Sequence, residues 1–440
     1  MIANPQTKRA SVRALGCRLN QYEVTAIADR LALAGYQVVP FGEPADLGVI
    51  NTCTVTNEAD AKSRNVIRRF IRVNPQAVTV VVGCYSQVGA SSVAEIPGVD
   101  YVIGNQDKMN LLEYIGEKKT DRPVVVRERI DRNDFSLSIN GDSPFEWRAN
   151  LKVQDGCDFM CSFCIIPFAR GRARSRAFDN LMEEAHSLAD RGVREVILTG
   201  VNIGTYQSQG YDFLALIGAL SSVSGLARIR ISSIEPTTIP EQLFPLMADP
   251  SHPLLPYLHV PLQAGCDRTL VAMKRKYQLD EIISFIQKAN ELVPNLCIGT
   301  DLMAGFPGET NDDFEQTCRT FLEHPFSYCH AFTFSERSGT SAARVADQVP
   351  MEERRRRSDR LRVLSASKRH DFYEAQVGRE AVILMEDPKN GFWPAYTENY
   401  VRVLVDSDRS DLANRIARVR LDRARPEYVE AELLEVLVET

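Results

Sequence analysis

Three cysteines stand close together near the middle of the chain, in the segment GCDFMCSFC at residues 156–164. Their C-x3-C-x2-C spacing lets Cys157, Cys161 and Cys164 hold three irons of a [4Fe–4S] cube from one tight loop, which leaves the fourth iron without a protein ligand. An open iron is a place where a substrate or a cofactor can bind. The ring of Phe163, just before the last cysteine, would shield such a cluster from solvent.

Zinc binding or plain packing is the alternative interpretation of these three thiols. A structural zinc ion normally takes four ligands, often from two paired knuckles. No fourth Cys or His stands nearby in the sequence, because His186 falls 22 residues after Cys164, inside a predicted helix. The spacing therefore favours an iron–sulfur cluster.

Cys17, Cys53 and Cys84 form a second, scattered set. Each follows the carboxyl end of a predicted strand, in the segments ALGCRLN, VINTCTV and VVGCYSQ. In an open parallel sheet the loops at that edge converge on one crevice, so the three thiolates could meet at a second cluster with one open iron. The alternative is that each is a small buried apolar residue, as free cysteines often are.

The elements that must position these cysteines follow a βα rhythm. In the first part, short apolar runs at 11–15, 48–51 and 79–83 alternate with helix-like segments at 21–34 and 57–73. This pattern is typical of βαβ units on a parallel sheet. The charged, apolar-poor stretch at 127–144 reads as a linker.

A second βα series begins near Asn150, so the central cysteines lie on the loop after its first strand. Its candidate strands are ANLKVQ, EVILTG, RIRISS, YLHVP, CIGTDLM and CHAFTF. Six such repeats fit a partial TIM-type barrel that is open on one side. A basic helical stretch at 351–376 follows, and the last 65 residues hold short β-like runs that predict a small antiparallel barrel of the kind that binds oligonucleotides, or else a generic β cap.

Composition and charge set broad bounds. The 440 residues suggest two to four domains, and 44% hydrophobic with 25% charged residues is an ordinary globular balance. We find no apolar run of membrane-spanning length and no signal core in MIANPQTKRA, so we expect no membrane association and a cytoplasmic location. Ten cysteines in an intracellular chain then point to metal or redox chemistry rather than to disulfides.

The net charge of −6 does not indicate nucleic-acid binding, but local charge allows it. Arginines alternate in the loop 170–176, and a second basic group occupies the segment 354–369. Either group could contact phosphates or could simply be solvated surface. Trp393 and Tyr400 could stack on bases or could pack in a core.

The central motif on this loop resembles the radical S-adenosylmethionine (SAM) superfamily. The resemblance implies that Cys157, Cys161 and Cys164 hold the catalytic cluster and that its open iron chelates the amino and carboxylate groups of SAM. One electron from the cluster would then cleave SAM and yield a 5′-deoxyadenosyl radical.

The same resemblance places further SAM contacts at the carboxyl ends of later strands, the catalytic rim of such barrels. Each glycine among them, taken singly, could be a plain turn. Arg176 is our candidate for pairing with the SAM carboxylate. The other residues expected to bind the cofactor are Phe163 at the cluster, Gly200 and Asn202 after the second strand, Ser232 and Glu235 after the third, Gln263 after the fourth, and Met303 and Gly305 at the fifth.

The N-terminal segments LGCRLNQYE, INTCTVTNEADAKSR and GCYSQ, with the central motif and the C-terminal β module, are similar to the radical SAM methylthiotransferases from about Ser11 to Val438. The resemblance implies two [4Fe–4S] clusters, the auxiliary one on Cys17, Cys53 and Cys84, and SAM as cofactors. It implies a flavodoxin-like domain at 8–125, a radical SAM domain with a partial (β/α)6 barrel at 143–372, and an RNA-contacting β-barrel, called TRAM, at 373–439.

In that family one SAM methylates a sulfur carried on the auxiliary cluster. A second SAM supplies the radical that takes hydrogen from C2 of an adenosine, where the methylthio group then couples. The segments CRLNQYE, NTCTVTN, IIPFARG and YTENY are most similar to the branch that modifies N6-threonylcarbamoyladenosine at position 37 of tRNA. Arg18 stands where a lysine is also common in that branch, which leaves the charge unchanged.

Other functions stay open at this point. The alternatives are the branch acting on isopentenyladenosine in tRNA, the branch acting on an aspartate of a ribosomal protein, and an iron–sulfur or zinc RNA-binding protein without catalysis. The expected partners are the tRNA anticodon stem-loop, a low-potential electron donor such as flavodoxin, and a sulfur source. We expect the protein to be a monomer.

Overall fold

The structure is a computed structural model that describes residues 7–137 and 147–437. It divides into two compact units, of which the first contains residues 1–144, 152–180 and 335–343 and the second contains the rest. The loop that carries the central cysteines therefore belongs to the same unit as the N-terminal cysteines. These units follow other boundaries than the three expected domains at 8–125, 143–372 and 373–439, which stay predictions.

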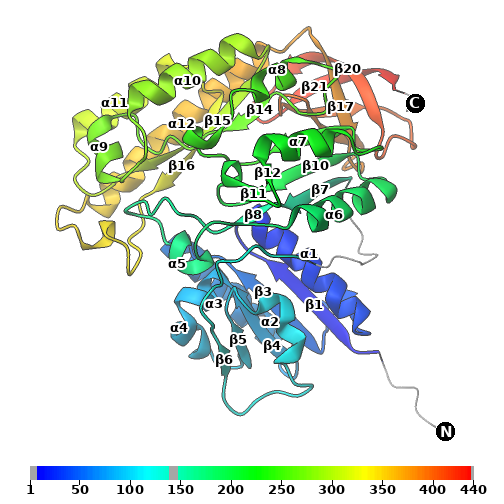
Figure 1. Cartoon of the computed structure of the whole chain (residues 1–440), viewed down its shortest axis with the longest axis vertical. Helices are drawn as coiled ribbons and strands as arrows, with labels where there is room; N and C mark the ends of the chain where they lie inside the picture. Colours follow the sequence, from blue (N-terminus) through cyan, green and yellow to red (C-terminus); the bar gives the residue numbers. More distant parts are fainter. Residues whose placement is uncertain (1–6, 138–146, 438–440) are drawn as a thin grey trace. The chain divides into compact units, whose positions relative to one another are not determined.

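The first unit is built on a six-stranded sheet in the order β2-β1-β3-β4-β5-β6, with parallel pairing throughout (Figure 1). The order 2-1-3-4-5 is that of flavodoxin-like folds, so the predicted fold of this part is confirmed. The strands are β1 (Arg9–Ala14), β2 (Gln37–Val39), β3 (Leu47–Thr52), β4 (Val78–Gly83), β5 (Tyr101–Ile103) and β6 (Val124–Val126).

Helices cover both faces of this sheet. Ile27 and Leu31 of one helix pack with Val80 on one face, while Ile67 and Phe70 of another pack with Val81 on the opposite face. Every residue of β3 and β4 is buried, as expected for central parallel strands. The helices of the unit are α1 (Arg18–Leu33), α2 (Asn57–Val73), α3 (Cys84–Val88), α4 (Ala90–Ala94), the 3₁₀ helix η1 (Lys108–Glu113) and α5 (Ile166–Arg170).

The expected linker at 127–144 is only partly within the described residues, since 138–144 lie outside them. The part that is described packs on the central loop segment of the same unit. Phe135 pairs with Arg176 in an isolated bridge, and the Leu137 N–H donates to Asn180 Oδ1 at 2.8 Å. Two short strands, β8 (Gln154–Asp155) and β9 (Arg174–Ser175), pair antiparallel at the base of the loop.

The second unit contains the partial barrel that the βα rhythm predicted. Its strands form two three-stranded groups, β13-β10-β7 and β14-β15-β16, and an isolated parallel bridge between Ser233 and His259 joins them. The strands are β7 (Arg148–Lys152), β10 (Glu195–Thr199), β13 (Arg228–Ile231), β14 (Tyr257–His259), β15 (Cys297–Ala304) and β16 (Tyr328–Thr333). All six predicted strands are confirmed.

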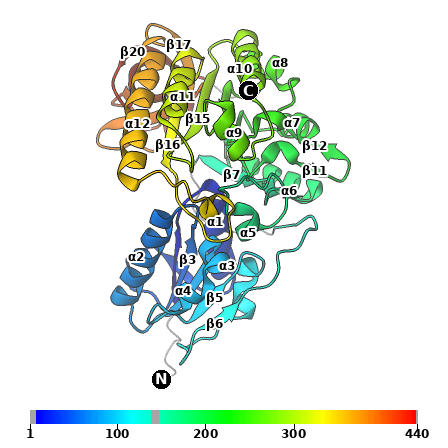
Figure 2. The same cartoon turned by 90° about the vertical axis from the view of Figure 1, so that its left-hand side faces the viewer.

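Amphipathic helices cover the outside of these strands. The helix α11 begins with a capping box, in which Thr310 and Asp313 satisfy each other's backbone N–H groups. The long helix α12 lies along β16 (Figure 2). The helices are α6 (Phe178–Asp190), α7 (Phe213–Ser221), α8 (Leu243–Ala248), α9 (Asp267–Ala272), α10 (Leu279–Leu292), α11 (Asn311–Glu323) and α12 (Met351–Glu374), and a small hairpin consists of β11 (Gln207–Ser208) and β12 (Tyr211–Asp212).

The C-terminal residues form a closed barrel in the order β17-β18-β19-β21-β20, which confirms the predicted small β-barrel. It is not wholly antiparallel as expected, because β19 and β21 pair parallel where the chain closes the barrel. Its core contains Trp393, Val403 and Val419. The sequence pattern missed β18, whose segment FWPAYT contains a proline in mid-strand. The strands are β17 (Glu380–Met385), β18 (Phe392–Thr397), β19 (Arg402–Asp406), β20 (Ile416–Ala424) and β21 (Val429–Val436).

A buried cluster of charged residues from β10 and β13 binds the C-terminal barrel, which belongs to the same unit. Glu195 binds Arg228 and Arg230, each at 2.8 Å. Both guanidinium groups also donate to backbone oxygens of the barrel, for example to Val382 and Thr397. Burial acts to raise the pKa of Glu195, but the two arginines outweigh it and lower the pKa to about 2. Breaking a buried pair of this kind typically costs about 3–5 kcal/mol.

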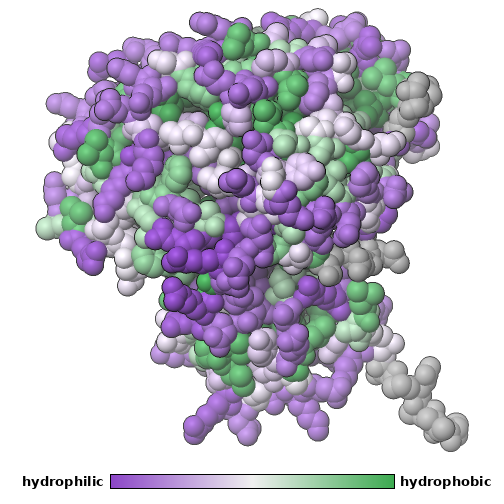
Figure 3. Space-filling view, in the orientation of Figure 1, coloured by the Kyte–Doolittle hydropathy of each residue, from purple (hydrophilic) through white to green (hydrophobic). Residues whose placement is uncertain are grey.

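Figure 3 shows one face of the molecule, on which hydrophilic and apolar residues are mixed. Hydrophilic side chains cover most of it, and apolar ones are scattered among them. Within the described residues, no helix combines the length and the apolar character that crossing a membrane requires.

Candidate active site

The three N-terminal cysteines follow neighbouring strands at the carboxyl edge of the sheet. Cys17 follows β1 and caps α1, Cys53 follows β3, and Cys84 follows β4 and opens α3. The register aligns these ends, since Ala14 pairs with Asn51 and Thr52 pairs with Gly83. The order of the sheet reverses between β1 and β3, and such a switch point is where open α/β sheets bind their ligands. The predicted convergence of the three strand ends is therefore present.

Close backbone packing holds these thiols together. Gly16 has φ +89°, and a Cβ added to it would lie 2.6 Å from Cβ and 2.7 Å from Sγ of Cys53. Gly83 has φ +97°, and a Cβ there would meet the Asn51 side chain at 2.2 Å. Both positions need glycine, because an L side chain is strained at such φ values and has no room here.

The three thiols shift one another's pKa values electrostatically. Burial raises the pKa of Cys53 to about 12, Cys84 and Cys17 act in the same direction, and the Val55 N–H acts against them. Three thiolates at one edge of the sheet would repel one another, so a bound cation is what would allow all three to ionise. The donor set thus fits a cluster that takes three cysteine ligands.

The central cysteines lie on a loop with an unusual backbone. Gly156 has φ +71° and Met160 has φ +48°. The Cys157 N–H donates to Gly171 O at 3.1 Å, and the Cys164 N–H donates to Cys161 O at 3.1 Å. The Phe159 N–H points at Cys157 Sγ at 3.4 Å. A backbone N–H directed at sulfur, as that of Phe159 is, suits an iron-bound thiolate, so this loop also fits a three-cysteine cluster.

A mononuclear zinc site would need its ligands to converge on one point. Across residues 7–137 and 147–437, no three or more Cys, His, Asp or Glu side chains converge on a point suited to a single metal ion. The thiolates of a cluster stand farther apart than the ligands of one ion, because each binds a different iron.

Five charged side chains that the sequence did not reveal as functional lie buried between the two cysteine sets in the first unit. They are Glu23, Lys108, Lys152, Asp155 and Arg170, and all are at most 5% exposed. Glu23 binds Lys108 at 2.5 Å, Lys152 at 2.9 Å and Arg170 at 3.0 Å. Asp155 binds Lys152 at 2.7 Å and Arg170 at 3.0 Å. We call these five residues the charge network.

The pKa shifts favour the ionised form of both carboxyl groups of the network. Burial acts to raise the pKa of Glu23, but Arg170, Lys108 and Lys152 outweigh it and hold that pKa below its usual range. Burial acts likewise on Asp155, where Arg170, Lys152 and Arg174 outweigh it. Burial lowers the pKa of Lys108 to about 8, against the attraction of Glu23. A hint was present in the sequence, since the buried side of α1 carries Asn20, Glu23 and Asp29 where a purely structural helix would carry apolar residues.

Two of the 170–176 arginines lie buried among protein groups. Arg170 cannot reach phosphates, because it is 1% exposed and bound to Glu23 and Asp155. Arg176 is fully buried and donates to Asn180, to the Tyr22 hydroxyl and to Leu137 O. The guanidinium of Arg176 is thus committed to protein oxygens, and the structure does not support its expected pairing with the SAM carboxylate.

The other residues expected to bind SAM, apart from Phe163 on the central loop, lie in the second unit at strand ends. Gly200 and Asn202 follow β10, and Ser232 follows β13. Gln263 has φ +73° and exchanges backbone hydrogen bonds with β15, accepting from the Met303 N–H at 2.8 Å. The fold therefore brings these segments to the carboxyl ends of the strands, while the assignment of each contact stays a prediction.

Two of these positions have well-defined surroundings. The Glu235 carboxylate pairs with Arg275, which also donates to Pro261 O, and burial raises the pKa of Glu235 despite this pairing. Gly305 has φ +74°, its N–H donates to Glu309 Oε2 at 2.6 Å, and a Cβ there would lie 2.3 Å from Arg354 Cγ. Both features fix the local geometry of the rim.

The second basic segment is mostly structural. Arg354 and Arg357 are buried, and Arg357 binds Glu309 at 2.7 Å. Lys368 donates to three carbonyl oxygens at the end of α11. The expectation that this segment as a whole grips phosphates is wrong for these three residues, because their charges serve the packing of α12.

Trp393 and Tyr400 pack rather than present free faces for bases. Trp393 belongs to the core of the β-barrel. Tyr400 stacks on Tyr396 at 4.8 Å and packs against Tyr257 and the guanidinium of Arg230.

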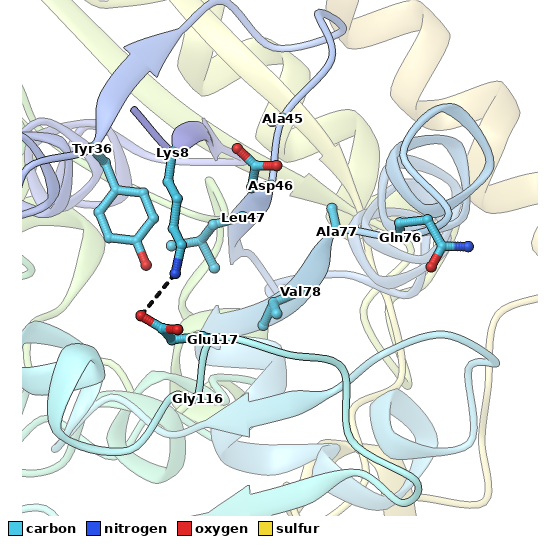
Figure 4. Close-up of a pocket in the computed structure, with 10 residues that line it drawn as sticks. All are labelled: Lys8, Tyr36, Ala45, Asp46, Leu47, Gln76, Ala77, Val78, Gly116 and Glu117. Carbon is cyan, nitrogen blue, oxygen red and sulfur yellow. Dashed lines mark ion pairs between the residues drawn. The ribbon is translucent and has the colours of Figure 1, made fainter. Parts of the chain in front are cut away.

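A pocket of about 170 Å³ lies at the other edge of the N-terminal sheet (Figure 4). Its lining includes Leu47 and Val78, which begin β3 and β4, and an ion pair of 2.8 Å between Lys8 and Glu117. Ligand sites of open α/β sheets lie at the carboxyl edge, so this pocket is separate from the candidate site.

Comparisons with known proteins agree with this geometry. Residues 151–321 match the model of the radical SAM superfamily, and residues 9–104 match that of the uncharacterized protein family UPF0004. A radical SAM methyltransferase from Kitasatospora setae, TsrM, has a similar structure, with a TM-score of 0.56 and 15% identity over 76% of this chain and 77% of that one. That likeness concerns the fold. As a radical SAM protein, the chain uses a [4Fe–4S] cluster and SAM.

Relatives match over nearly the whole chain. The threonylcarbamoyladenosine tRNA methylthiotransferase MtaB of Bacillus subtilis is 37% identical, over 96% of both chains. The protein of the same name from Aquifex aeolicus is 35% identical over 90% of this chain and 96% of its own. A tRNA-2-methylthio-N(6)-dimethylallyladenosine synthase from Pseudomonas paraeruginosa is 33% identical over 97% and 99%. The chain therefore belongs to the radical SAM methylthiotransferase family.

Proposed function

We propose that the protein adds a methylthio group to C2 of N6-threonylcarbamoyladenosine at position 37 of tRNA, with two [4Fe–4S] clusters and SAM. The observation that carries this proposal is the presence, in one compact unit, of two separate sets of three cysteines, each suited to a cluster with one open iron. The similarity to the threonylcarbamoyladenosine enzymes supports the choice of substrate.

The central set would generate the radical. Cys157, Cys161 and Cys164 would hold a cluster that, when bound, supplies the electron for the cleavage of SAM. Phe163 would limit the access of water to it. In the second unit, the strand ends would orient SAM through Gly200 and Asn202, through Ser232 and Glu235 at the ribose, and through Gln263, Met303 and Gly305 at the far end of the cofactor.

The N-terminal set would deliver sulfur. Cys17, Cys53 and Cys84 provide three ligands, which leaves one iron available for the sulfur that is transferred. Cys17 is exposed, whereas Cys53 and Cys84 are buried, so the set opens to solvent on the side of Cys17. A small sulfur carrier can approach from that side.

The remaining assignments are parts of the same proposal. The C-terminal β-barrel would contact the RNA around the anticodon stem-loop, since small barrels of this kind bind oligonucleotides. A low-potential donor such as flavodoxin would supply electrons, and a separate sulfur source would reload the N-terminal set. The protein would act as a monomer in the cytoplasm.

Nucleoside analysis of tRNA tests the substrate. We expect cells that lack the protein to lose 2-methylthio-N6-threonylcarbamoyladenosine and to keep the methylthiolated dimethylallyl nucleoside, as measured by mass spectrometry. The opposite pattern would instead support the dimethylallyladenosine branch. This second candidate rests on the 33% identity to a synthase of that branch. Unchanged tRNA together with loss of methylthiolation on a ribosomal protein would overturn the tRNA assignment.

Anaerobic reconstitution tests the chemistry. We expect about eight irons per chain, which is two four-iron clusters, and cleavage of SAM under reductant. Zinc in place of iron, with no cleavage, would reject the radical chemistry and favour the alternative of a protein without catalysis.

A further inference from the structure

The charge network forms a continuous path between the two cysteine sets of the first unit. At one end, Asn105 Nδ2 lies 3.5 Å from Cys84 Sγ, and Asn105 Oδ1 accepts from Lys108 Nζ at 2.7 Å. Lys108 then binds Glu23, which binds Lys152 and Arg170. These two cations bind Asp155, whose side chain accepts from the Gly156 N–H at 2.9 Å, next to Cys157.

The five residues do not balance in charge. Lys108, Lys152 and Arg170 are cations, whereas Glu23 and Asp155 are the only anions of the five. A fourth cation, Arg174, lies 3.8 Å from Asp155. An excess of buried positive charge is costly unless negative charge compensates it.

The thiolates of Cys17, Cys53 and Cys84, once they hold a cluster, would supply compensating negative charge. Arg170 acts to lower the pKa of Cys17 and of Cys53, and both Cys84 and Cys17 act in return to raise the pKa of Arg170. Arg170 therefore lies within electrostatic reach of all three sulfurs. In a low-dielectric interior this attraction is much stronger than it would be in water.

We propose that the charge network sets the reduction potential of the cluster held by Cys17, Cys53 and Cys84. One-electron reduction adds one negative charge to the cluster, and the excess positive charge of the network stabilises that state. Within the network, Lys108 and Glu23 are positioning residues that act on the cluster through charge without binding it. This inference rests on the proposed binding of a cluster by the N-terminal cysteines.

Two substitutions of opposite sign test the proposal in the full-length reconstituted protein. Lys108→Met removes a positive charge at similar length, and Glu23→Gln removes a negative charge without changing the shape. The N-terminal cluster is titrated with dithionite and redox mediators and followed by electron paramagnetic resonance. Its signal is assigned by comparison with a chain in which Cys157, Cys161 and Cys164 are all alanine.

We expect the ratio of reduced to oxidised N-terminal cluster, at a fixed applied potential, to fall about tenfold in Lys108→Met and to rise about tenfold in Glu23→Gln. Lys108→Arg keeps the charge and should keep the ratio. Lys119→Met is the matched control, because Lys119 binds the buried Asp100 at 2.7 Å at the opposite edge of the same sheet. It should leave the ratio unchanged.

Other results overturn the proposal. Shifts of the same sign in Lys108→Met and Glu23→Gln would indicate structural disturbance rather than charge. If Lys108→Met fails to retain the cluster, Glu23→Gln decides alone, and a ratio that does not rise rejects the proposal. Unchanged ratios in a protein that still methylthiolates tRNA would reject this inference and leave the proposed function intact. About four irons in the unsubstituted protein, without an N-terminal signal, would reject the cluster assignment itself.

Discussion

The two cysteine sets present the same three ligands by different means. Cys157, Cys161 and Cys164 lie within eight residues of one loop, and the backbone of that loop positions them. Cys17, Cys53 and Cys84 lie on three separate strand ends, and only the register of the sheet brings them together. The central set therefore depends on local conformation, whereas the N-terminal set depends on the whole flavodoxin-like fold.

This difference suits a division of labour. The geometry of a compact loop depends mainly on contacts between residues that are near in sequence, such as the hydrogen bond from the Cys164 N–H to Cys161 O. A site on three strand ends shares its stability with the core beneath it, because β3 and β4 are buried along their whole length. The charge network then joins a local site to a site that depends on the fold, within one unit.

The largest effect should come from the central set. In the triple alanine variant of Cys157, Cys161 and Cys164, we expect SAM cleavage to fall to background and bound iron to drop by about half. The N-terminal set should keep its cluster, since its three ligands come from other elements. Iron analysis and the yield of 5′-deoxyadenosine measure the two quantities. Loss of all iron would show that the sets do not assemble independently.

Cys53→Ala should disable the N-terminal set and leave the central set intact. Because Cys53 belongs only to the N-terminal set, we expect SAM cleavage to continue while methylthiolation of tRNA is lost. The control is Cys297→Ala, since Cys297 is a buried cysteine in β15 of the second unit. It should keep both activities, at some cost in stability. Methylthiolation that persists without Cys53 would contradict the sulfur-delivery role.

The same contrast between local and long-range structure explains which strands could be predicted from the sequence. Apolar runs followed by cysteine predicted β1, β3 and β4 and their shared edge, and the βα rhythm predicted all six barrel strands. The strands β2, β5 and β6 were missed because three residues are too few to show an alternation. The strand β18 was missed because Pro394 interrupts its pattern.

The charge network could not be predicted for a different reason. Arg170 lies 147 positions from Glu23, and in sequence it belongs to a run of alternating arginines that resembles a phosphate-binding loop. Only the packing of distant segments decides which charges of such a run are buried. Arg170 and Arg176 turn inward, whereas Arg172, with 44% of its side chain exposed, does not.

Each cysteine set has one nearby glycine whose substitution should abolish only the activity of that set. In Gly156→Ala, the new Cβ would lie 2.0 Å from the Arg172 carbonyl oxygen, so we expect loss of SAM cleavage through distortion of the loop. In Gly16→Ala, it would lie 2.6 Å from Cys53 Cβ, so we expect loss of methylthiolation while SAM cleavage persists.

Gly210→Ala is the control for both variants. Gly210 has φ +86° with no atom within 4 Å of an added Cβ, so the substitution adds backbone strain of about 1–2 kcal/mol without a clash. Activities that fall equally in all three variants would mean that strain, not steric contact with the cysteine sites, causes the loss.

The last prediction concerns the charge network between the two cysteine sets, and it is a change with pH in the free energy of unfolding. Because the folded pKa of Glu23 lies well below its ordinary value of 4.5, this carboxylate stabilises the fold at any pH above about 4.5. The contribution is lost as the pH falls below that value and through the folded pKa. Glu23→Gln should therefore lower the apo-protein's free energy of unfolding by roughly 3–5 kcal/mol at pH 7. Urea unfolding should show the gap between the two proteins narrowing as the pH falls from 4.5 towards 3. A gap that stays constant over this range would mean that the loss of stability in Glu23→Gln does not come from the titration of Glu23, and that charge does not join the two cysteine sets.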